Sequence, residues 1–458
     1  MHRGINQMNG KRGELQMGTN QNGMRQFCIA FIATFFMQAL VSGDDWPQWR
    51  GSNRDGIWAE TGLVKKFSKP EIKKKWRVAI GSGYSGPTVA AGRVFVMDRL
   101  TEPDQFERVL CFHEETGKPL WKHRYPCEYR NVGYVAGPRA SVTVDENLCF
   151  SIGTMGHLKC FDVDTGKLTW EVDCDSEYRI SKDRRMPIWG IAASPLVYKD
   201  LVIVHLGTEG SSLVAFHKKT GKEIWRSLDD RAQYSSPILC RQGEQDVCVI
   251  WTGDNVVGIN PVDGKPFWKI PFRPRNMPIG IATPIVENGR LFVTSFYDGS
   301  LMIRLDNEKP VATEIWRRSG RNERKTEALH SIISTPVFKG EHIYGVDSYG
   351  EFRCILAKNG DRVWQDDSAV PNARWSTIHF VENGQQTWMF TERGELIIGE
   401  LSPDGFKEVS RSKLLDPTTQ QLRQRKGVCW SHPAYANRCV FARNDKELVA
   451  ASLAEEMP

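Results

Sequence analysis

The hexapeptide Thr165-Gly-Lys-Leu-Thr-Trp170 recurs along this chain of 458 residues, and its repetition decides the fold. Three further copies share the Gly-Lys-x-x-Trp pattern, at Thr116–Trp121, Thr220–Trp225 and Asp263–Trp268, and Asn359–Trp364 is a close variant. Seven tryptophans in all follow one another at intervals of 43 to 55 residues: Trp76, Trp121, Trp170, Trp225, Trp268, Trp316 and Trp364. A sequence period in the forties indicates a propeller or a solenoid.

Each repeat is predicted to form four antiparallel strands. Within Thr283–Trp316, a short apolar strand leads to the hairpin signal Asn288-Gly289, and an alternating strand follows from Arg290. Two further turns then lead through Leu301–Leu305 to the strand that ends at Trp316. Four such strands make one propeller blade.

Eight inner strands are predicted, because a short strand-opening motif occurs eight times. Proline is common in these motifs, since the first residue of a strand need not donate a hydrogen bond to the ladder. The motifs are Gly86-Pro87, Ala140-Ser141, Ser194-Pro195, Ser236-Pro237, Thr283-Pro284, Thr335-Pro336, Ser376-Thr377 and His432-Pro433.

Eight outer strands match them if Phe406–Val409 replaces a lost tryptophan. The segment Lys74–Ile80 has no inner strand before it, and the inner strand at His432 has no outer strand after it. We therefore expect Lys74–Ile80 to complete the last blade beside Leu448–Leu453, which removes an open sheet edge. The predicted fold class is all-β: an eight-bladed β-propeller of four-stranded antiparallel blades, with the last blade completed by the N-terminal strand.

The seven repeat tryptophans have a predicted structural role. The Gly-Lys pair closes the turn before the outermost strand, and the indole then covers the gap between neighbouring blades. Burial of a tryptophan removes about 150–250 Å² from water, so loss of one such side chain is expected to cost about 3–5 kcal/mol of stability.

The ends of the chain predict export. The apolar run Phe27–Val41 follows Arg25 and precedes small residues, as in a secretory signal peptide, although an uncleaved anchor is the alternative. We expect residues 1–23 to be an upstream extension, 24–43 the signal peptide, 44–70 an N-terminal mature segment and 71–458 the propeller. A periplasmic or extracellular protein without a membrane span after cleavage is expected, most simply as a monomer.

Charge and cysteine content narrow the function classes. The net charge falls from +6 to +3 without residues 1–43, which does not favour nucleic acid as a partner. No Cys-x-x-Cys occurs, so thioredoxin-type, zinc-ribbon and c-type haem motifs are excluded. Cys240 and Cys248 flank the predicted turn Gln242–Gln245 and would face each other across a hairpin, either as free thiols or as a disulfide.

The hexapeptides, their mean period of 48 residues and the Ser/Thr-Pro strand openings resemble the pyrroloquinoline-quinone-type (PQQ-like) propeller repeat over residues 71–453. This resemblance implies one of two functional kinds: calcium- and quinone-dependent dehydrogenases, or cofactor-free scaffolds such as the BamB-like proteins of outer-membrane assembly. The segment Asp45–Gly51 is also similar to the opening of exported propeller proteins of planctomycete-type bacteria.

Catalytic signatures point away from an enzyme. Gly81–Gly86 matches a dinucleotide fingerprint, but Pro87 and a strand pattern follow where a helix is needed. No H-E-x-x-H or G-x-S-x-G motif occurs, and the Cys-Cys dipeptide that the resemblance implies for quinoprotein dehydrogenases is missing. We therefore assign no catalytic residue and no metal, and expect no cofactor, with quinone plus calcium as the alternative.

Two sets of side chains are candidate binding residues, both on loops that join an outer strand to the next inner strand. One is a set of aromatic or histidine side chains expected at the funnel mouth, where they either pack as a plug or form a socket for a ligand or peptide. Seven of the eight repeats contribute such a side chain, and the remaining repeat has Ile279. The seven are Tyr84, Tyr134, Trp189, Tyr234, His330, Trp375 and Trp430. The other is either a solvated basic surface or a docking face for an acidic segment: Arg184, Arg185, Arg273, Arg275, Arg317, Arg321, Arg324 and Arg425.

Together these patterns predict an exported, non-catalytic protein-binding or scaffold module of the cell envelope, with an envelope protein or acidic segment as its partner. The alternatives are a quinone- and calcium-dependent dehydrogenase, and an extracytoplasmic propeller that senses a ligand in its funnel.

Overall fold

The computed structural model of the chain describes residues 44–418, 420 and 426–455. The predicted extension 1–23, the predicted signal peptide 24–43 and Arg425 lie outside the described residues. The described residues belong to the compact unit Ser42–Pro458. Their regular structure consists of 32 strands and one short helix, α1 (Cys174–Glu177), and none of their helices is long and apolar enough to span a bilayer.

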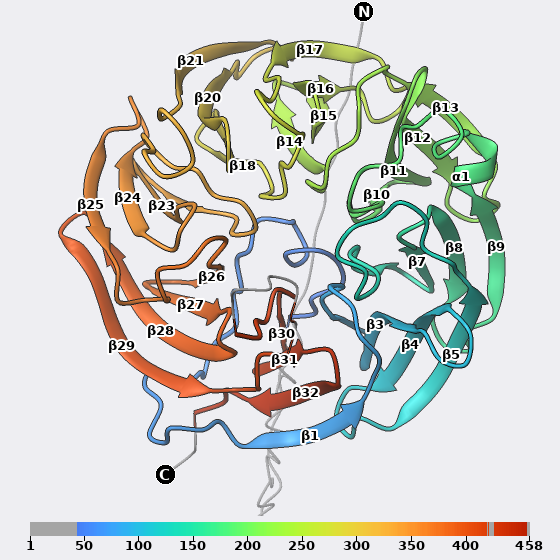
Figure 1. Ribbon diagram of the computed structural model, residues 1–458, viewed down its shortest axis with the longest axis horizontal. Coiled ribbons are helices and arrows are strands. Elements are labelled where there is room, and N and C mark those ends of the chain that lie inside the picture. The colour runs from blue at the N-terminus through green and yellow to red at the C-terminus, as the bar shows by residue number, and fades with distance from the viewer. Residues whose placement is uncertain (1–43, 419, 421–425, 456–458) are drawn as a thin grey trace, which may run out of the picture. The chain divides into compact units, whose positions relative to one another are not determined.

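Eight four-stranded antiparallel sheets form a ring, which confirms the predicted eight-bladed propeller (Figure 1). We number the blades 1 to 8 from the first complete sheet in the chain. Blade 1 consists of β2 (Thr88–Ala90), β3 (Arg93–Leu100), β4 (Phe106–His113) and β5 (Pro119–Pro126), and blade 2 of β6 (Thr143–Asp145), β7 (Leu148–Ile152), β8 (His157–Asp162) and β9 (Leu168–Asp173). Blade 3 consists of β10 (Leu196–Tyr198), β11 (Leu201–Thr208), β12 (Ser211–His217) and β13 (Glu223–Ser227), and blade 4 of β14 (Ile238–Gln242), β15 (Gln245–Trp251), β16 (Asn255–Ile259) and β17 (Pro266–Pro271).

The second half of the ring repeats this arrangement. Blade 5 consists of β18 (Ile285–Glu287), β19 (Arg290–Ser295), β20 (Gly299–Leu305) and β21 (Ala312–Arg318), and blade 6 of β22 (Val337–Lys339), β23 (His342–Val346), β24 (Phe352–Leu356) and β25 (Arg362–Asp366). Blade 7 consists of β26 (Ile378–Asn383), β27 (Gln386–Thr391), β28 (Glu395–Ser402) and β29 (Gly405–Lys413), and blade 8 of β30 (Ala434–Ala436), β31 (Cys439–Arg443), β32 (Glu447–Ser452) and β1 (Lys74–Ala79). Every inner strand begins one or two residues after its predicted opening motif, and β29 contains the predicted substitute segment Phe406–Val409.

The last blade is closed by the first strand, as predicted. In Figure 1, β1 lies beside β32 at the outer edge of blade 8. The two strands are antiparallel, with Ala79 opposite Glu447 and Val78 opposite Leu448. Pairing of the two ends of the propeller leaves no interruption in the ring of sheets, and it removes the edge that β32 would otherwise expose.

The repeat tryptophans join neighbouring blades through hydrogen bonds. Trp170 Nε1, for example, donates to the Lys218 carbonyl of the next blade at 2.8 Å. Trp268 does this indirectly: its Nε1 donates to Gln242 Oε1 at 2.8 Å, and Gln242 Nε2 donates to the Val311 carbonyl of blade 5 at 2.8 Å. The other five donate directly to a carbonyl of the next blade: Trp76 to Glu114, Trp121 to Val163, Trp225 to Pro261, Trp316 to Ala357 and Trp364 to Ser402.

The glycine of the hexapeptide has a second role that the sequence did not reveal. Gly221 adopts φ +70°, as its turn requires, and a Cβ there would lie 2.7 Å from the Trp170 ring of the preceding blade. The indole of one blade therefore packs flat on the turn of the next. The same glycine–tryptophan contact occurs at Gly117 with Trp76, Gly166 with Trp121, Gly264 with Trp225 and Gly360 with Trp316.

Cys240 and Cys248 were expected to face each other across a hairpin, which is wrong, and of the two states considered for them both are free thiols. Gln242 pairs with Gln245, so the hairpin loop has two residues, and Cys240 lies opposite Val247 rather than Cys248. The two cysteines therefore point to opposite faces of the sheet, because alternate residues of a strand do so. A facing pair would have needed a loop with an odd number of residues.

Residues 46–58 lie at the centre of the ring (Figure 1). The Trp46 amide donates to Val89 in β2, and the Trp58 amide donates to Glu382 in β26, both at 2.8 Å. Between them, the buried guanidinium of Arg54 donates to the carbonyls of Pro195 and, at 3.0 Å, Pro237. We call residues 46–58 the central plug. A cavity of about 900 Å³ remains between it and blades 3 to 7, lined among others by Ser52, Asp55, Leu196, Ile285, Phe338 and Glu382.

Candidate functional site

A small aromatic cavity lies where the loops between blades converge. We call the face that carries these outer-to-inner strand connections the loop face. The cavity has a volume of about 130 Å³, and six of the seven predicted funnel residues line it: Tyr84, Tyr134, Trp189, Tyr234, Trp375 and Trp430. The remaining lining includes Trp49 of the central plug, Arg139, His379, His432, Ile281, Ile332 and Ile333.

The aromatic side chains contact one another across the ring as well as around it. Trp189 of the loop before blade 3 and Trp375 of the loop before blade 7 have ring centroids 5.8 Å apart. Tyr134 and Trp430, from the loops before blades 2 and 8, are 5.9 Å apart, and Trp189 stacks on Tyr234 at 4.8 Å. The aromatic side chains therefore pack against one another over much of the funnel mouth and still enclose a cavity.

Two of these aromatic residues adopt a strained backbone. Tyr134 has φ +54° and Trp375 has φ +65°, in the left-handed region that bulky side chains rarely occupy. Such a conformation costs of order 1–3 kcal/mol and persists where surrounding structure enforces it, often at binding sites. Both residues are thereby held with their rings toward the cavity.

The polar groups of the cavity are few. Trp375 Nε1 and Trp430 Nε1 are buried and have no hydrogen-bond partner among the described residues. Arg139 is already engaged, because its guanidinium donates to the carbonyls of Gly133 at 2.8 Å and Tyr134 at 2.5 Å and to Thr154 Oγ1 at 3.2 Å. Tyr84 Oη is also buried without a partner among the described residues, so this hydroxyl and the two indoles are the groups most available to a polar ligand.

Both histidines of the lining are neutral at pH 7. Burial lowers the pKa of His379 to about 4, and its Nε2 lies 2.9 Å from the Trp430 carbonyl. Burial also lowers the pKa of His432 well below its usual range, and the nearby His379 adds to this effect. No Asp or Glu is among the lining side chains in the described part of the chain. The cavity thus presents aromatic faces, two indole donors and one bonded cation.

His330, the seventh predicted funnel residue, does not line the cavity. Its side chain is fully buried, with Nδ1 3.0 Å from the Phe296 carbonyl and Nε2 accepting from the Gly320 amide at 3.1 Å. Ile279 is buried as well, and Ile281, Ile332 and Ile333 supply the lining from blades 5 and 6.

Sequence reasoning missed four lining residues that carry an indole, a guanidinium or an imidazole group: Trp49, Arg139, His379 and His432. Trp49 reaches the cavity from the central plug, where its Nε1 donates to Thr283 Oγ1 at 2.7 Å and its ring meets His432 edge-on at 4.1 Å. Two of the four lie in motifs that were recognised for other reasons, the opening segment Asp45–Gly51 and the strand start His432-Pro433. Only their three-dimensional convergence reveals a shared cavity.

The described members of the predicted basic set lie in outer-to-inner connections or near the end of β21, on the loop face. Arg184, Arg273 and Arg321 are exposed, and their side chains make no hydrogen bond or ion pair among the described residues. Arg185 is half-buried, and Arg425 lies outside the described residues. The remaining three interact with neighbouring residues. Arg275 donates a hydrogen bond to the Tyr297 carbonyl, Arg317 donates one to Glu314, and the Arg324 guanidinium lies over the Tyr349 ring.

Exposed apolar side chains lie on the same connections, and the sequence analysis did not single them out. Val135, Ile188 and Met277 are 53%, 47% and 38% exposed, and all three belong to outer-to-inner loops. Ile188 shares its loop with Arg184, and Met277 shares its loop with Arg273. The loop face therefore combines apolar anchors with unpaired guanidinium groups.

Comparison with known proteins gives the family. The family model described as outer membrane protein assembly factor BamB matches residues 105–366, more than half of the chain. The outer membrane protein assembly factor BamB of Burkholderia pseudomallei is 21% identical over 358 residues, which are 74% of this chain and 74% of that protein. The crystal structure of BamB from Moraxella catarrhalis has a similar fold, with a TM-score of 0.56 and 14% identity over 83% of this chain and 99% of that one.

The same comparison finds enzymes. A quinoprotein ethanol dehydrogenase of Pseudomonas putida is 33% identical over 130 residues, which are 26% of this chain. The matched region spans 19% of that enzyme, so the chain covers about a fifth of its length.

Proposed function

Because the chain belongs to the family of outer membrane protein assembly factor BamB, we propose that it is a non-catalytic scaffold that binds a protein partner in the cell envelope. We further propose that it is exported, as its apolar segment Phe27–Val41 suggests. The observation that carries the proposal is the pairing of exposed apolar side chains with unpaired arginines on the loop face.

This surface has the composition of a protein-binding site. Exposed Val135, Ile188 and Met277 can each bury apolar area against a partner, and burial contributes about 25 cal/mol per Å². Arg184 and Arg273 share loops with Ile188 and Met277, and neither forms an ion pair among the described residues. Arginine is enriched among the residues that dominate binding energy, since its planar head forms paired hydrogen bonds with carboxylates.

The positive charge of the arginines and the apolar character of the exposed side chains indicate the chemistry of the partner. A segment that carries Asp or Glu beside apolar side chains matches both features at once. The positive charges of the loop-face arginines would accelerate association and make its rate sensitive to salt. The apolar contacts would set the lifetime of the complex.

A quinoprotein dehydrogenase is the alternative that the enzyme relatives suggest, but the aromatic cavity does not fit that cofactor. Calcium requires several oxygen ligands, mostly carboxylates, and no carboxylate lines the cavity in the described part of the chain. Its volume of about 130 Å³ is also below the ~300–1,000 Å³ of sites that enclose drug-sized ligands. We therefore favour the scaffold.

Site-specific photo-cross-linking tests the proposal. A photoreactive amino acid at Ile188 should capture an envelope protein of the organism that encodes the chain. The same amino acid at Ile224 on β13 is a matched control, because the two side chains are 47% and 48% exposed and Ile224 lies on the rim of the ring. Equal cross-linking from both positions, or none from Ile188, would contradict a partner site on the loop face.

Charge reversal then tests the arginines. The triple change Arg184→Glu, Arg273→Glu and Arg321→Glu should abolish the cross-link from Ile188. The control is the triple change Lys118→Glu, Lys167→Glu and Lys222→Glu, which alters the charge equally at exposed hexapeptide turns on the opposite face. Loss of capture in both triple variants would indicate a general charge effect and would sink the assignment of the docking face.

A further inference from the structure

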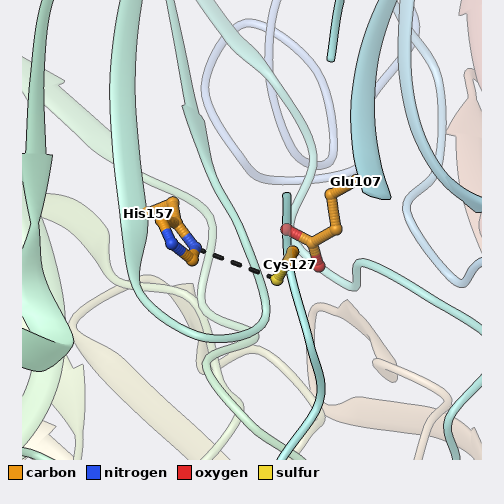
Figure 2. A group of neighbouring side chains, drawn as sticks. All are labelled: Glu107, Cys127 and His157. Carbon is orange, nitrogen blue, oxygen red and sulfur yellow. Dashed lines mark hydrogen bonds between the residues drawn. The ribbon is translucent and has the colours of Figure 1, made fainter. Parts of the chain in front are cut away.

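A buried group of three potential metal ligands lies at the seam between blades 1 and 2, away from the aromatic cavity. Glu107 belongs to β4, Cys127 directly follows β5, and His157 begins β8 of the next blade. One ligand atom from each residue lies within 4.8 Å of the others, and Cys127 Sγ is 3.9 Å from His157 Nδ1 (Figure 2). Glu107 and Cys127 are buried, whereas His157 is partly exposed, so an ion could enter past the imidazole.

The carboxylate of Glu107 is buried without a cation. Its side chain is 0% exposed, and no Lys or Arg forms an ion pair with it among the described residues. Arg99 and Lys159 lie over the rings of the two tyrosines that bond to this carboxylate, and neither forms an ion pair with it. A buried ionised group is costly unless it is paired or binds a metal. The position therefore calls for a positive charge that the protein itself does not supply.

Hydrogen bonds fix this carboxylate and leave part of it open. Tyr125 Oη donates to one oxygen at 2.7 Å, and the other accepts from Tyr129 Oη at 2.5 Å and from the Thr154 amide at 3.0 Å. An ionised carboxylate has about four acceptor positions, so one remains. Outer contacts of this kind orient the ligands of metal sites and raise their affinity.

The backbone is shaped around the same point. A Cβ at Gly153 would collide with the Glu107 carboxylate and would lie 2.5 Å from Tyr125 Oη. Only glycine at this turn between β7 and β8 leaves room for the carboxylate and the Tyr125 hydroxyl. The cradle is thus built by both blades.

We propose that Glu107, Cys127 and His157 hold a zinc ion, with water as the fourth ligand. Sulfur, imidazole nitrogen and carboxylate oxygen are the three donor types that zinc binds in proteins. A zinc–sulfur bond of about 2.3 Å and a zinc–nitrogen bond of about 2.0–2.1 Å together exceed the observed separation of Sγ and Nδ1, so one ion can span both atoms. Because His157 comes from blade 2 and the other ligands from blade 1, the ion would cross-link the two blades.

Cobalt(II) is the probe for this site, since it takes the place of zinc and reports a thiolate ligand by a charge-transfer absorption band. The mature protein should bind one equivalent of cobalt(II) with this band, and added zinc should abolish the band. Cys127→Ser should remove the band, and His157→Gln should weaken cobalt affinity by at least about 100-fold, beyond the 10–100-fold typical of outer contacts. Cys240→Ser is the matched control, because Cys240 is another free thiol, in β14 of blade 4, and it should leave binding unchanged.

Two results would overturn the proposal. One is the absence of a thiolate band in the folded parent protein with excess cobalt(II), which would mean that Cys127 is only a buried thiol beside Glu107. The other is an unchanged band in Cys127→Ser. Since the first result comes from the unmodified protein, it holds even if the variants fold poorly. The parent protein should also unfold at a higher temperature with zinc than with a chelator, and equal unfolding temperatures would count against the site.

Discussion

Trp170 shows how a single side chain couples two blades. Its ring packs on Gly221 and its Nε1 bonds to Lys218, both in the next blade. Gly221→Ala should therefore cost about 1–2 kcal/mol for the left-handed backbone plus about 1–3 kcal/mol for crowding against the indole. Trp170→Ala should cost about 3–5 kcal/mol. Urea unfolding followed by circular dichroism measures both losses.

Gly210→Ala is the control for this contact. Gly210 has φ +67°, close to the +70° of Gly221, but a Cβ there would meet nothing within 4 Å. Its substitution should show the backbone cost alone. If the two alanine variants unfold at the same urea concentration, the glycine–indole contact contributes nothing.

His205 in β11 makes stability depend on pH. The side chain is 2% exposed, and burial lowers its pKa to about 4 from 6.5. Between those values the unfolded chain binds a proton that the folded protein does not, so stability falls as pH drops from 6.5 to 4 and levels off below. The difference of pKa corresponds to about 3 kcal/mol.

His205→Leu should reduce that pH-dependent loss by about 3 kcal/mol in urea unfolding measured from pH 7 to pH 4. An identical profile in His205→Leu and the parent would show that His205 does not remain neutral in the fold.

At the scale of the element, β1 is the strand on which ring closure depends. Ala79 lies opposite Glu447 of β32, and opposed residues of antiparallel strands are close enough for a disulfide. The double change Ala79→Cys and Glu447→Cys should stabilise the oxidised protein by about 3–5 kcal/mol, because the bond closes a very long loop. The reduced form of the same variant is the control. Equal unfolding midpoints for the two forms, with the cross-link verified by mass, would contradict the closure role.

The elements also show what a sequence can predict. The inner strands and the pairing of β1 with β32 were predicted because a regular period leaves one position vacant in the last blade. The cross-strand partner of Cys240 was not predicted correctly. A hairpin loop one residue longer would change that partner, and local sequence preference does not determine the length of the loop. The central plug was not predicted either, because Trp46 and Trp58 are held by strands far away in sequence.

At the scale of the whole molecule, the binding residues were predicted only in part. Tyr84, Tyr234 and Trp375 could be placed at the funnel because each shortly precedes an inner strand. His330 also precedes an inner strand, yet two backbone groups hold its ring below the surface. The exposed Ile188 escaped notice, since no local pattern tells an exposed loop residue from a buried one.

The cavity leads to a prediction about cofactors. Addition of pyrroloquinoline quinone with calcium to the chain from Asp44 onward should give no saturable change in tryptophan fluorescence, because no described side chain that lines the aromatic cavity is a carboxylate. Calorimetry provides the second readout, and the apoenzyme of a quinoprotein dehydrogenase is the positive control. Saturable, calcium-dependent binding at micromolar concentration would refute the scaffold interpretation and favour an enzyme.

The pairing of β1 with β32 has a consequence for biosynthesis. A ribosome makes β1 early and its partner roughly 370 residues later, which takes roughly 20–70 s at the usual rate of translation. Throughout this time the nascent strand lacks β32, and Trp58 of the central plug lacks Glu382 of blade 7. A holdase chaperone that covers these first residues until the last blade emerges would protect the chain from aggregation. Completion of the ring is then a single late event rather than the sum of eight independent ones.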